Sequence, residues 1–303
     1  MDPLSDILSL LNPSGSVSAG FRAGGDWALR LPPPEGVKFY AVVEGGCWLT
    51  VEGQPPVRLR QGDCFLTSKP LPYTLASDPS VPPIEAHQVF ARREDHTAVI
   101  GTGADLFMIG GRFGFDGEAA LLLDSLPPVL VVGGESEEAA VLRWALQRLA
   151  AEMSGASPGS ALVAGHLAHL MLVQVLRLHL ASRDGHPPGW LSALSDGRVA
   201  AAIKAVHAEP ARRWTVEELA AVAGVSRSTF ALRFKRKVGL APLDYVLRWR
   251  MQIAARDLRS RGGPISAVAE ALGYDSDSAF SAAFKRVMAC SPRDYRLRHA
   301  SAA

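Results

Sequence analysis

The last third of the chain contains an internal repeat whose apolar positions follow helical spacing. Residues 216–242 and 265–292 align when one extra residue is allowed in the second copy, and the alignment places Phe230 opposite Phe280. In each copy, one apolar stripe with helical periodicity is followed by a break and then by a second stripe. The pattern predicts a helix, a tight turn and a second helix, twice in succession.

Local capping signals place the ends of these helices. Thr215 with Glu218 forms a capping-box pattern at the start of the first helix, and Gly224 suits the left-handed residue that ends it. Ser226 is suited to cap a second helix, whose Phe230 faces the core. In helix-turn-helix proteins, this second helix enters the major groove of DNA.

A further helix is predicted between the two copies, over residues 242–261. It starts at Pro242 and stops at Gly262-Gly263. At about 1.5 Å per residue it is roughly 30 Å long, close to the ~34 Å of one turn of duplex DNA. Such a spacer would hold two recognition helices in successive major grooves, whereas a helical bundle that binds another protein is the alternative.

The first part of the chain alternates apolar and polar residues, which is typical of β-strands. Residues 37–43 and 47–52 alternate on either side of Glu44-Gly45-Gly46, so two strands joined by a short loop are expected. Residues 57–60 and 64–66 repeat the pattern around a second turn. Short strands at this spacing predict a small barrel or sandwich.

Two helices are predicted between these regions, over 135–154 and 160–182, with a Gly/Pro-rich linker at 183–189. The second helix is apolar on more than half of its circumference, so it needs a partner surface. A second protomer or the barrel could supply that surface. The expected dimerisation stripe consists of Val163, Leu167, Met171, Val175 and Leu178.

Length and composition agree with a soluble two-domain protein. The 303 residues are 48% hydrophobic and 20% charged, and neither a signal peptide nor a membrane span is expected. The three cysteines are widely spaced, which argues against a disulfide scaffold and favours the cytoplasm.

Charge is divided unevenly along the chain. Residues 1–195 carry a net charge of −7 and residues 196–303 carry +9, so the overall value of +2 hides a basic C-terminal third. Clustered Lys and Arg residues favour a polyanion as ligand, because binding releases the counterions condensed on its phosphates.

The C-terminal residues resemble the DNA-binding domain of the AraC/XylS family of bacterial transcription regulators. The motifs that carry the resemblance include Trp214-Thr215-Val216, Phe234-Lys235-Arg236, Trp249-Arg250-Met251, Gly273-Tyr274, Phe284-Lys285-Arg286 and Ser291-Pro292-Arg293. The resemblance implies a seven-helix domain that binds double-stranded DNA through two helix-turn-helix units. It also implies a homodimer formed through the helical pair at 135–182, contact with RNA polymerase, and a regulator that is more often an activator.

The resemblance assigns roles to residues of the two recognition helices. Its base-reading positions fall on Arg227, Ser228, Ala231 and Leu232 in the first helix, and on Asp277, Ser278, Ser281 and Ala282 in the second. Many relatives have arginine where this chain has Leu232 and Ala282, so modest base readout and a large phosphate contribution are expected. The other residues expected to contact DNA are basic side chains that bind phosphates and hydroxyl residues near the starts of the recognition helices. They are Ser226, Thr229, Arg233, Lys235, Arg236, Arg250, Ser276, Lys285 and Arg286.

The N-terminal strands, from Gly36 to about residue 132, resemble the cupin-like sensor domain of one AraC-family branch. The resemblance implies a small-molecule effector, and the expected effector-binding residues are Lys38, Tyr40, Cys47, Trp48, Cys64 and Tyr73. Cupins that bind a metal use histidines where Lys38, Tyr40 and Tyr73 stand here, so no metal or cofactor is expected.

Two alternatives to an effector-controlled regulator stay open. Cys47 and Cys64 could form a thiol-based redox switch, although buried free cysteines are mostly small core residues. A cupin-type enzyme with a DNA-binding appendage is disfavoured, because we find no catalytic constellation and no metal ligands, and no enzyme activity is expected.

These expectations combine into an α+β protein with two domains. They divide the chain into a cupin-like sensor at 1–132, a helical hairpin at 133–185, a linker at 186–195 and a double helix-turn-helix domain at 196–303.

Overall fold

The computed structural model describes residues 2–93, 97–115, 126–154, 157–182, 188–260 and 263–300. The chain divides into two compact units, each with its own core. Pro13–Gly114 and Leu126–Gly185 form one of them, here called the sheet unit; Met1–Asn12 and His186–Ala303 belong to the other, the helical unit. Residues 183–187 of the predicted linker lie outside the described residues.

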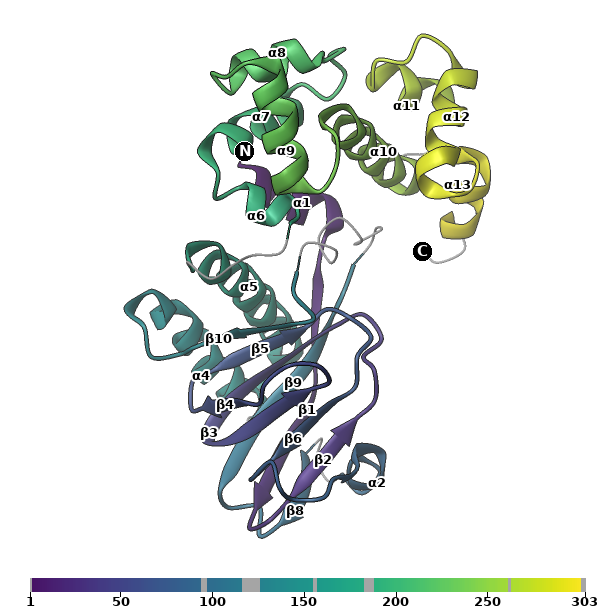
Figure 1. The fold of residues 1–303 in the computed structure, drawn as a ribbon. Helices are drawn as coiled ribbons and strands as arrows, with labels where there is room; N and C mark the ends of the chain where they lie inside the picture. The colour runs from purple at the N-terminus through teal and green to yellow at the C-terminus, as the bar shows by residue number, and fades with distance from the viewer. Residues whose placement is uncertain are drawn as a thin grey trace. The chain divides into compact units, whose positions relative to one another are not determined.

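Ten strands among the described residues form the curled, mainly antiparallel sheet of the sheet unit (Figure 1). Their order is β7-β2-β6-β3-β9-β1-β8, with β4 and β5 paired to β3 and β10 paired to β5. The bounds are β1 Ser14–Gly24, β2 Ala28–Leu31, β3 Val37–Val51, β4 Val57–Arg60, β5 Cys64–Thr67, β6 Tyr73–Ala76, β7 Ile84–Glu85, β8 Thr97–Gly101, β9 Leu106–Gly114 and β10 Val129–Val132.

The loop expected at Glu44-Gly45-Gly46 is a β-bulge instead. β3 runs through it without a break, and its register against β9 shifts between Val42 and Glu44. Gly45 has a φ of 75°, and a Cβ there would lie 1.9 Å from the carbonyl oxygen of Asp105. Only glycine permits this approach of two backbones, so the glycine pair bends the strand rather than reversing it.

The concave face of the sheet has an apolar core, in which Phe21, Trp27, Leu49, Leu75 and Met108 are buried. The short helix α2 (Ala86–Phe90) packs on β2 and β8. The curled sheet with this apolar core confirms the cupin-like half of the predicted α+β fold.

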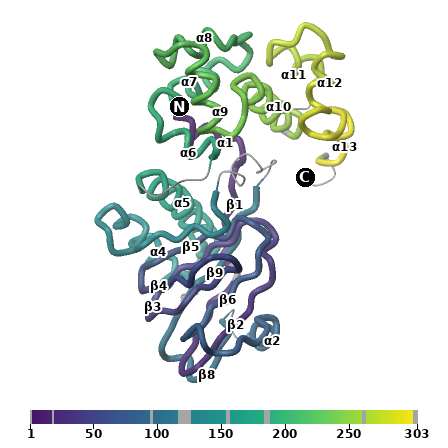
Figure 2. Tube along the Cα trace, viewed as in Figure 1, coloured from purple at the N-terminus to yellow at the C-terminus, as the bar shows by residue number. Residues whose placement is uncertain are grey.

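The predicted helical hairpin is present as η1 (Glu137–Ala139), α4 (Ala140–Ser154) and α5 (Ser160–Ala181). α5 packs against α4, β1 and β10, and α4 and α5 lie side by side in the trace (Figure 2). At Gly15 of β1, a Cβ would lie 2.7 Å from the Cβ of Ala168, so helix and strand are in close contact. By length and composition α5 could cross a membrane, yet its sheet-facing side is buried in this unit.

The helical unit contains the two predicted helix-turn-helix copies. The first consists of α8 (Val216–Val222) and α9 (Arg227–Val238), the second of α11 (Ile265–Ala271) and α12 (Asp277–Met288). α10 (Pro242–Ser260) joins them, and α7 (Gly197–Ala208) and α13 (Pro292–Ala300) flank them along the chain (Figure 1). The capping box of Thr215 with Glu218 and the left-handed Gly224, at a φ of 64°, confirm the predicted helix ends.

Two helices of this unit were not foreseen. α1 (Pro3–Leu11) packs on α7 and α10 and buries Ile7 and Leu11, so the first twelve residues do not belong to the same unit as residues 13–114. α6 (Trp190–Ala193) lies inside the predicted linker 186–195, and all four of its residues are buried. Trp190 and Leu191 therefore make this segment part of the core rather than a spacer.

Candidate nucleic-acid interface

The recognition helix α9 has one buried and one exposed face. Phe230 and Phe234 are each 1% exposed and hold the helix on the unit's core, because residues four apart share a face. Ser228 and Lys235 are exposed on the other side, and Leu232 is 72% exposed. An apolar side chain so exposed beside a hydroxyl is suited to the methyl groups and base edges of a major groove.

Helix α12 repeats this arrangement. Phe280 and Phe284 are fully buried, whereas Asp277, Ser278 and Ala282 are exposed. In α9 and α12 alike the residue at the fifth helical position is half-buried, Ala231 in one and Ser281 in the other. The two helices therefore offer equivalent faces.

The two recognition helices also begin in the same way. Ser226 Oγ accepts from Thr229 N at 3.3 Å, and Ser276 Oγ accepts from Ala279 N at 3.2 Å. Both Ser hydroxyls are exposed at the helix start, where backbone N–H groups and the helix dipole attract phosphate.

The basic residues expected to contact DNA fall into two groups. Four of them extend from the exposed faces of α9 and α12 and form no ion pair with a carboxylate of the described residues: Lys235, Arg236, Lys285 and Arg286. Others have protein partners. Arg227 Nε lies 2.9 Å from Glu217 Oε1 on the surface, and a base contact by Arg227 would require this exposed ion pair to open.

Arg233 is bonded to the start of α7. Its Nε donates to Asp196 Oδ2 at 2.6 Å, and the same carboxylate caps α7 through Arg198 N and Val199 N. Burial acts to raise the pKa of Asp196, but the hydrogen bond from Arg233 and those from the helix N–H groups lower it overall. Arg233 thus joins α9 to α7.

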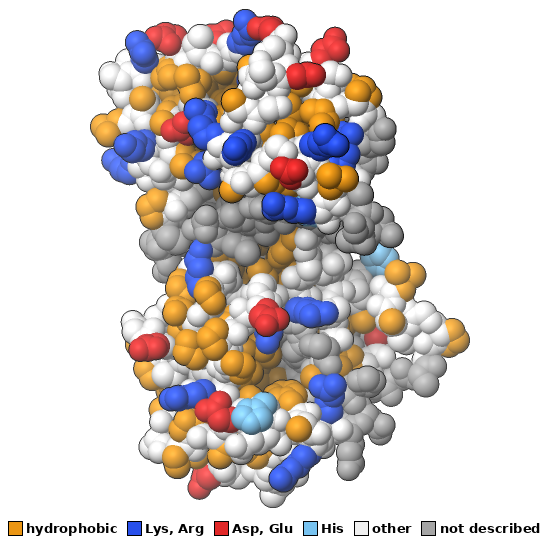
Figure 3. Space-filling view, turned by 90° about the vertical axis from the view of Figure 1, so that its right-hand side faces the viewer, with side chains coloured by type: hydrophobic (Ala, Val, Ile, Leu, Met, Phe, Trp, Pro, Cys, Tyr) orange, Lys and Arg blue, Asp and Glu red, His pale blue; other side chains and the backbone are white. Residues whose placement is uncertain are grey.

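An open hollow next to this pair is strongly basic. It is lined by Ser195, Asp196, Gly197, Arg198, Arg233, Arg236 and Lys237. Arg198 and Lys237 are not among the residues predicted from the sequence to contact DNA. Lys237 lies one helical turn from Arg233, which was a detectable signal, whereas the approach of Arg198 to α9 depends on the tertiary fold. Lys and Arg side chains are spread over the visible face of the helical unit (Figure 3).

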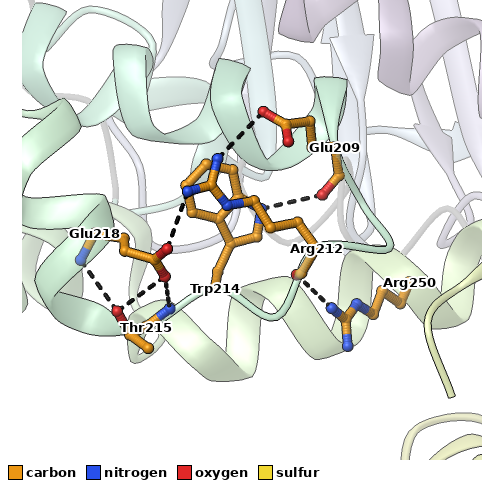
Figure 4. A network of polar contacts seen from close by, with 6 residues as sticks. All are labelled: Glu209, Arg212, Trp214, Thr215, Glu218 and Arg250. Atoms are coloured by element: carbon orange, nitrogen blue, oxygen red, sulfur yellow. Dashed lines mark hydrogen bonds and ion pairs between the residues drawn. The ribbon is translucent and has the colours of Figure 1, made fainter. Parts of the chain in front are cut away.

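Arg250, expected at a phosphate, points instead toward the loop between α7 and α8. Its Nε donates to Pro210 O at 2.6 Å. Its Nη2 donates to Arg212 O at 2.6 Å (Figure 4). Two of its three nitrogens are therefore directed at the protein's own backbone.

The residues expected to bind an effector are divided between the two faces of the sheet. Tyr40 and Tyr73 meet on the concave face, where their hydroxyls are 2.5 Å apart and Phe65 stacks on Tyr40 at 4.8 Å. Burial raises the pKa of both phenols, so both are neutral at physiological pH. Lys38 is half-buried on β3, whereas Trp48 lies on the face opposite Cys47, with Arg58 over its ring at 5.6 Å.

The two cysteines also lie on opposite faces of the sheet. Cys47 belongs to the concave core and its Sγ is 3.8 Å from Met108 Sδ, whereas Cys64 precedes the inward-facing Phe65 and pairs with Ala41. Burial raises the pKa of each thiol to about 12. β5, which Cys64 begins, pairs with β3, which carries Cys47, yet the two thiols are on opposite faces because successive residues of a strand point to opposite faces.

The dimerisation stripe on α5 needs a similar correction. Leu167, Met171 and Val175 are 7%, 3% and 2% exposed, since they lie on the side of α5 that packs on the sheet. Leu178 is half-buried. Val163, at 41%, and its neighbour Leu162, at 68%, are exposed. Val141 and Trp144 of α4 are exposed too.

Both regions of the chain match known families, and full-length relatives are known. The cupin family profile matches residues 2–181, and a helix-turn-helix domain profile matches residues 219–298. An AraC-like transcription regulator from Streptomyces lividans is 47% identical over 98% of both chains. The RCS-specific HTH-type transcriptional activator RclR from Escherichia coli is 29% identical, also over 98% of both chains.

Among solved structures, the DNA-binding domain of AdpA in complex with a target DNA is 31% identical. The matched region covers 33% of this chain and 90% of the AdpA domain, with a TM-score of 0.32. Two similar helix-turn-helix units, a curled cupin sheet and full-length similarity to the Streptomyces protein lead to one assignment: the chain belongs to the AraC-like transcription regulators, with a cupin region and a helix-turn-helix DNA-binding region.

Proposed function

We propose that this regulator binds duplex DNA by placing α9 and α12 in two successive major grooves. The observation that carries the proposal is the equivalence of the two helices, which share a serine cap, two buried phenylalanines and an exposed face ending in Lys-Arg. The 19-residue α10 between the two copies is roughly 28 Å long, which suits sites about one helical turn apart.

Affinity and specificity have different sources in this arrangement. Lys235, Arg236, Lys285 and Arg286 bind phosphates, and the basic hollow around Arg198 and Lys237 takes a further phosphate beside α9. Ser228, Leu232 and Ser278 read bases, with Leu232 against thymine methyl groups. Since phosphate contacts dominate, binding is strongly salt-dependent.

The test is a salt titration with the full chain. A duplex selected by the protein from a random-sequence pool is titrated from 50 to 200 mM salt, and the log–log slope is about −0.9 per phosphate contacted. Lys285→Ala should make the slope about one unit less negative and weaken binding to all sequences alike. Ser278→Ala should change the base preference at one position.

Lys204→Ala, at an exposed lysine of α7, is the matched control and should leave the slope unchanged. Selection without enrichment of any sequence, or binding that does not weaken with salt, contradicts the proposal.

The sheet unit is the proposed sensor, and it acts by binding rather than by catalysis. Its concave face carries the Tyr40–Tyr73 hydroxyl pair among aromatic side chains, which suits a small, largely apolar molecule that can replace the hydrogen bond between the two hydroxyls. The test is a screen of small molecules for a shift in the thermal midpoint. Tyr73→Phe should abolish the shift given by a hit, whereas Tyr274→Phe, in the helical unit, should keep it.

The remaining proposals concern the cellular setting. The protein acts in the cytoplasm as an activator that contacts RNA polymerase, in keeping with the activator named among its relatives. It does so as a homodimer, formed by exposed apolar side chains of the α4–α5 hairpin such as Trp144 and Leu162. Sedimentation of the full chain tests the mass, and transcription from a promoter carrying the selected site tests the direction of regulation.

A further inference from the structure

The two helix-turn-helix copies meet at a junction centred on Arg250. One side of it is the loop 209–214, between α7 and α8; the other is the turn 273–275, between α11 and α12. Arg250, on α10, donates to three carbonyl oxygens of that loop: Pro210 and Arg212 at 2.6 Å and Ala211 at 3.4 Å. Its guanidinium carbon also lies 5.8 Å from the ring centre of Tyr274.

Two further contacts hold the loop and the turn together. Gly273 has a φ of 78°, and a Cβ built there would lie 2.2 Å from Ala211 O, so the two backbones are in close contact. Arg213 forms an ion pair with Asp275 across the same junction. The separation between loop and turn is therefore fixed by backbone contact as well as by Arg250.

The loop is firmly attached to the first helix-turn-helix copy (Figure 4). Arg212 stacks over Trp214 at 4.2 Å and bonds Glu218 at 3.0 Å, and Trp214 Nε1 donates to Glu209 O at 3.1 Å. Glu218 in turn accepts from Thr215 N at 2.8 Å, which completes the capping box that starts α8.

The turn is attached just as directly to the second recognition helix. The Tyr274 ring packs edge-on against Phe280 of α12 at 5.5 Å, and Phe280 is fully buried in the core of that copy. A continuous set of contacts thus runs from the start of α8, through the loop and Arg250, to α12.

We propose that Arg250 is a positioning residue that fixes the spacing and angle between the two recognition helices, and hence the separation of the two DNA sites read together. The inference rests on the proposed DNA-binding function. A guanidinium is suited to the role because its planar donors can bond two carbonyls while its face meets an aromatic ring, which an ammonium cannot reproduce. A residue that only binds a phosphate would instead act through its charge.

The test uses the full chain and the duplex it selects, together with duplexes that contain one, two or three extra base pairs between the two footprinted sites. Each added pair rotates the second site by about 35°, so a rigid junction penalises it strongly. Wild-type protein should lose affinity steeply with the first insertion.

Arg250→Lys keeps the positive charge and removes the planar guanidinium that bonds two carbonyls at once. We expect it to bind the selected duplex about tenfold more weakly, because looser coupling lowers the effective concentration of the second helix at its site. Its salt slope and its affinity for a duplex with one site should stay at the wild-type values, and the penalty for an inserted pair should shrink. Arg248→Lys, at an exposed arginine on the same helix, is the matched control and should behave as wild type.

Gly273→Ala perturbs the junction from the other side without changing charge, and it should reproduce the relaxed spacing. If Arg250→Lys and Gly273→Ala both keep the wild-type spacing profile, the inference is overturned. It is equally overturned if Arg250→Met loses about one unit of salt slope with an unchanged spacing profile, since Arg250 is then a phosphate ligand. Wild-type protein that selects no duplex would instead refute the proposed function itself.

Discussion

Asp6 Oδ2 lies 3.3 Å from His207 Nδ1, although 201 residues separate them in the sequence. The other ring nitrogen of His207 lies 2.8 Å from Tyr245 Oη, and the ring stacks on Trp249 with centres 3.7 Å apart. Burial lowers the pKa of His207 to about 3, so the ring is neutral at physiological pH. Its Nδ1–H then donates to Asp6 and its Nε2 accepts from Tyr245. The first helix of the chain is thereby bonded into the core of the helical unit.

This buried imidazole should make the helical unit sensitive to acid. Its folded pKa of about 3 is below the unfolded value of 6.5, so between these values only the unfolded chain takes up the proton. His207 therefore contributes full stability above pH 6.5, and this contribution falls with decreasing pH by at most ~1.4 kcal/mol per unit. Urea unfolding at pH 7, 6 and 5 measures the slope.

His207→Phe is the comparison, because it retains a ring against Trp249 and cannot be protonated. The variant should be less stable at pH 7, with a shallower dependence on pH than the wild type. Equal slopes in the two proteins would show that His207 is not the titrating group.

Docking of α1 should stabilise the helical unit measurably. Ile7 is 1% exposed, and truncating such a side chain usually costs about 2–5 kcal/mol. Ile7→Ala should therefore lower hydrogen-exchange protection in α7 and α10, on which α1 packs. Ser9→Ala, at an exposed position of the same helix, should leave protection unchanged. Protection in α7 and α10 that is insensitive to Ile7→Ala would mean that α1 does not dock there.

The buried thiols should react slowly. With pKa values of about 12, Cys47 and Cys64 are almost entirely protonated at neutral pH, and the thiolate is the reactive form. Labelling by a thiol reagent should wait for local unfolding, and mild oxidation should give no Cys47–Cys64 disulfide, since the two lie on opposite faces of the sheet. Mass spectrometry of the oxidised, folded protein would reveal such a crosslink and so restore the redox alternative.

The two sides of α5 should respond differently to charge. Leu167→Asp places a carboxylate in the buried side and should destabilise the sheet unit by about 3 kcal/mol or more. Leu162→Asp changes an exposed position, so stability should stay within ~0.5 kcal/mol while self-association weakens. Thermal unfolding and sedimentation report the two effects. A folded monomer from Leu167→Asp would reverse the assignment of the two sides.

The features that were predictable from sequence are the ones that local signals encode. Thr215 with Glu218, Gly224 and the paired phenylalanines fix the helix-turn-helix units, because caps, left-handed glycines and helical stripes act over a few residues. The left-handed glycine and the phenylalanine pair recur in the second copy as Gly273, Phe280 and Phe284, so each copy supports the assignment of the other.

The errors arose where distant contacts decide. Gly45-Gly46 satisfies the local pattern of a turn and that of a bulge, and only the pairing of β3 with β9 selects the bulge. On α5 the apolar surface covers more than half of the helix, so periodicity does not reveal which side meets the sheet. The bonds from Arg250 to a loop 38 to 40 residues away were equally out of reach of local signals, because only the tertiary fold brings the two together.

The central claim, that α9 and α12 occupy successive major grooves, is tested most directly by hydroxyl-radical footprinting of the full chain on its selected duplex. The structure predicts two protected patches on one face of the DNA, with centres about 10–10.5 base pairs apart. Arg250→Lys should weaken both patches together at limiting protein concentration. A single protected patch, or two patches on opposite faces of the duplex, would contradict the account.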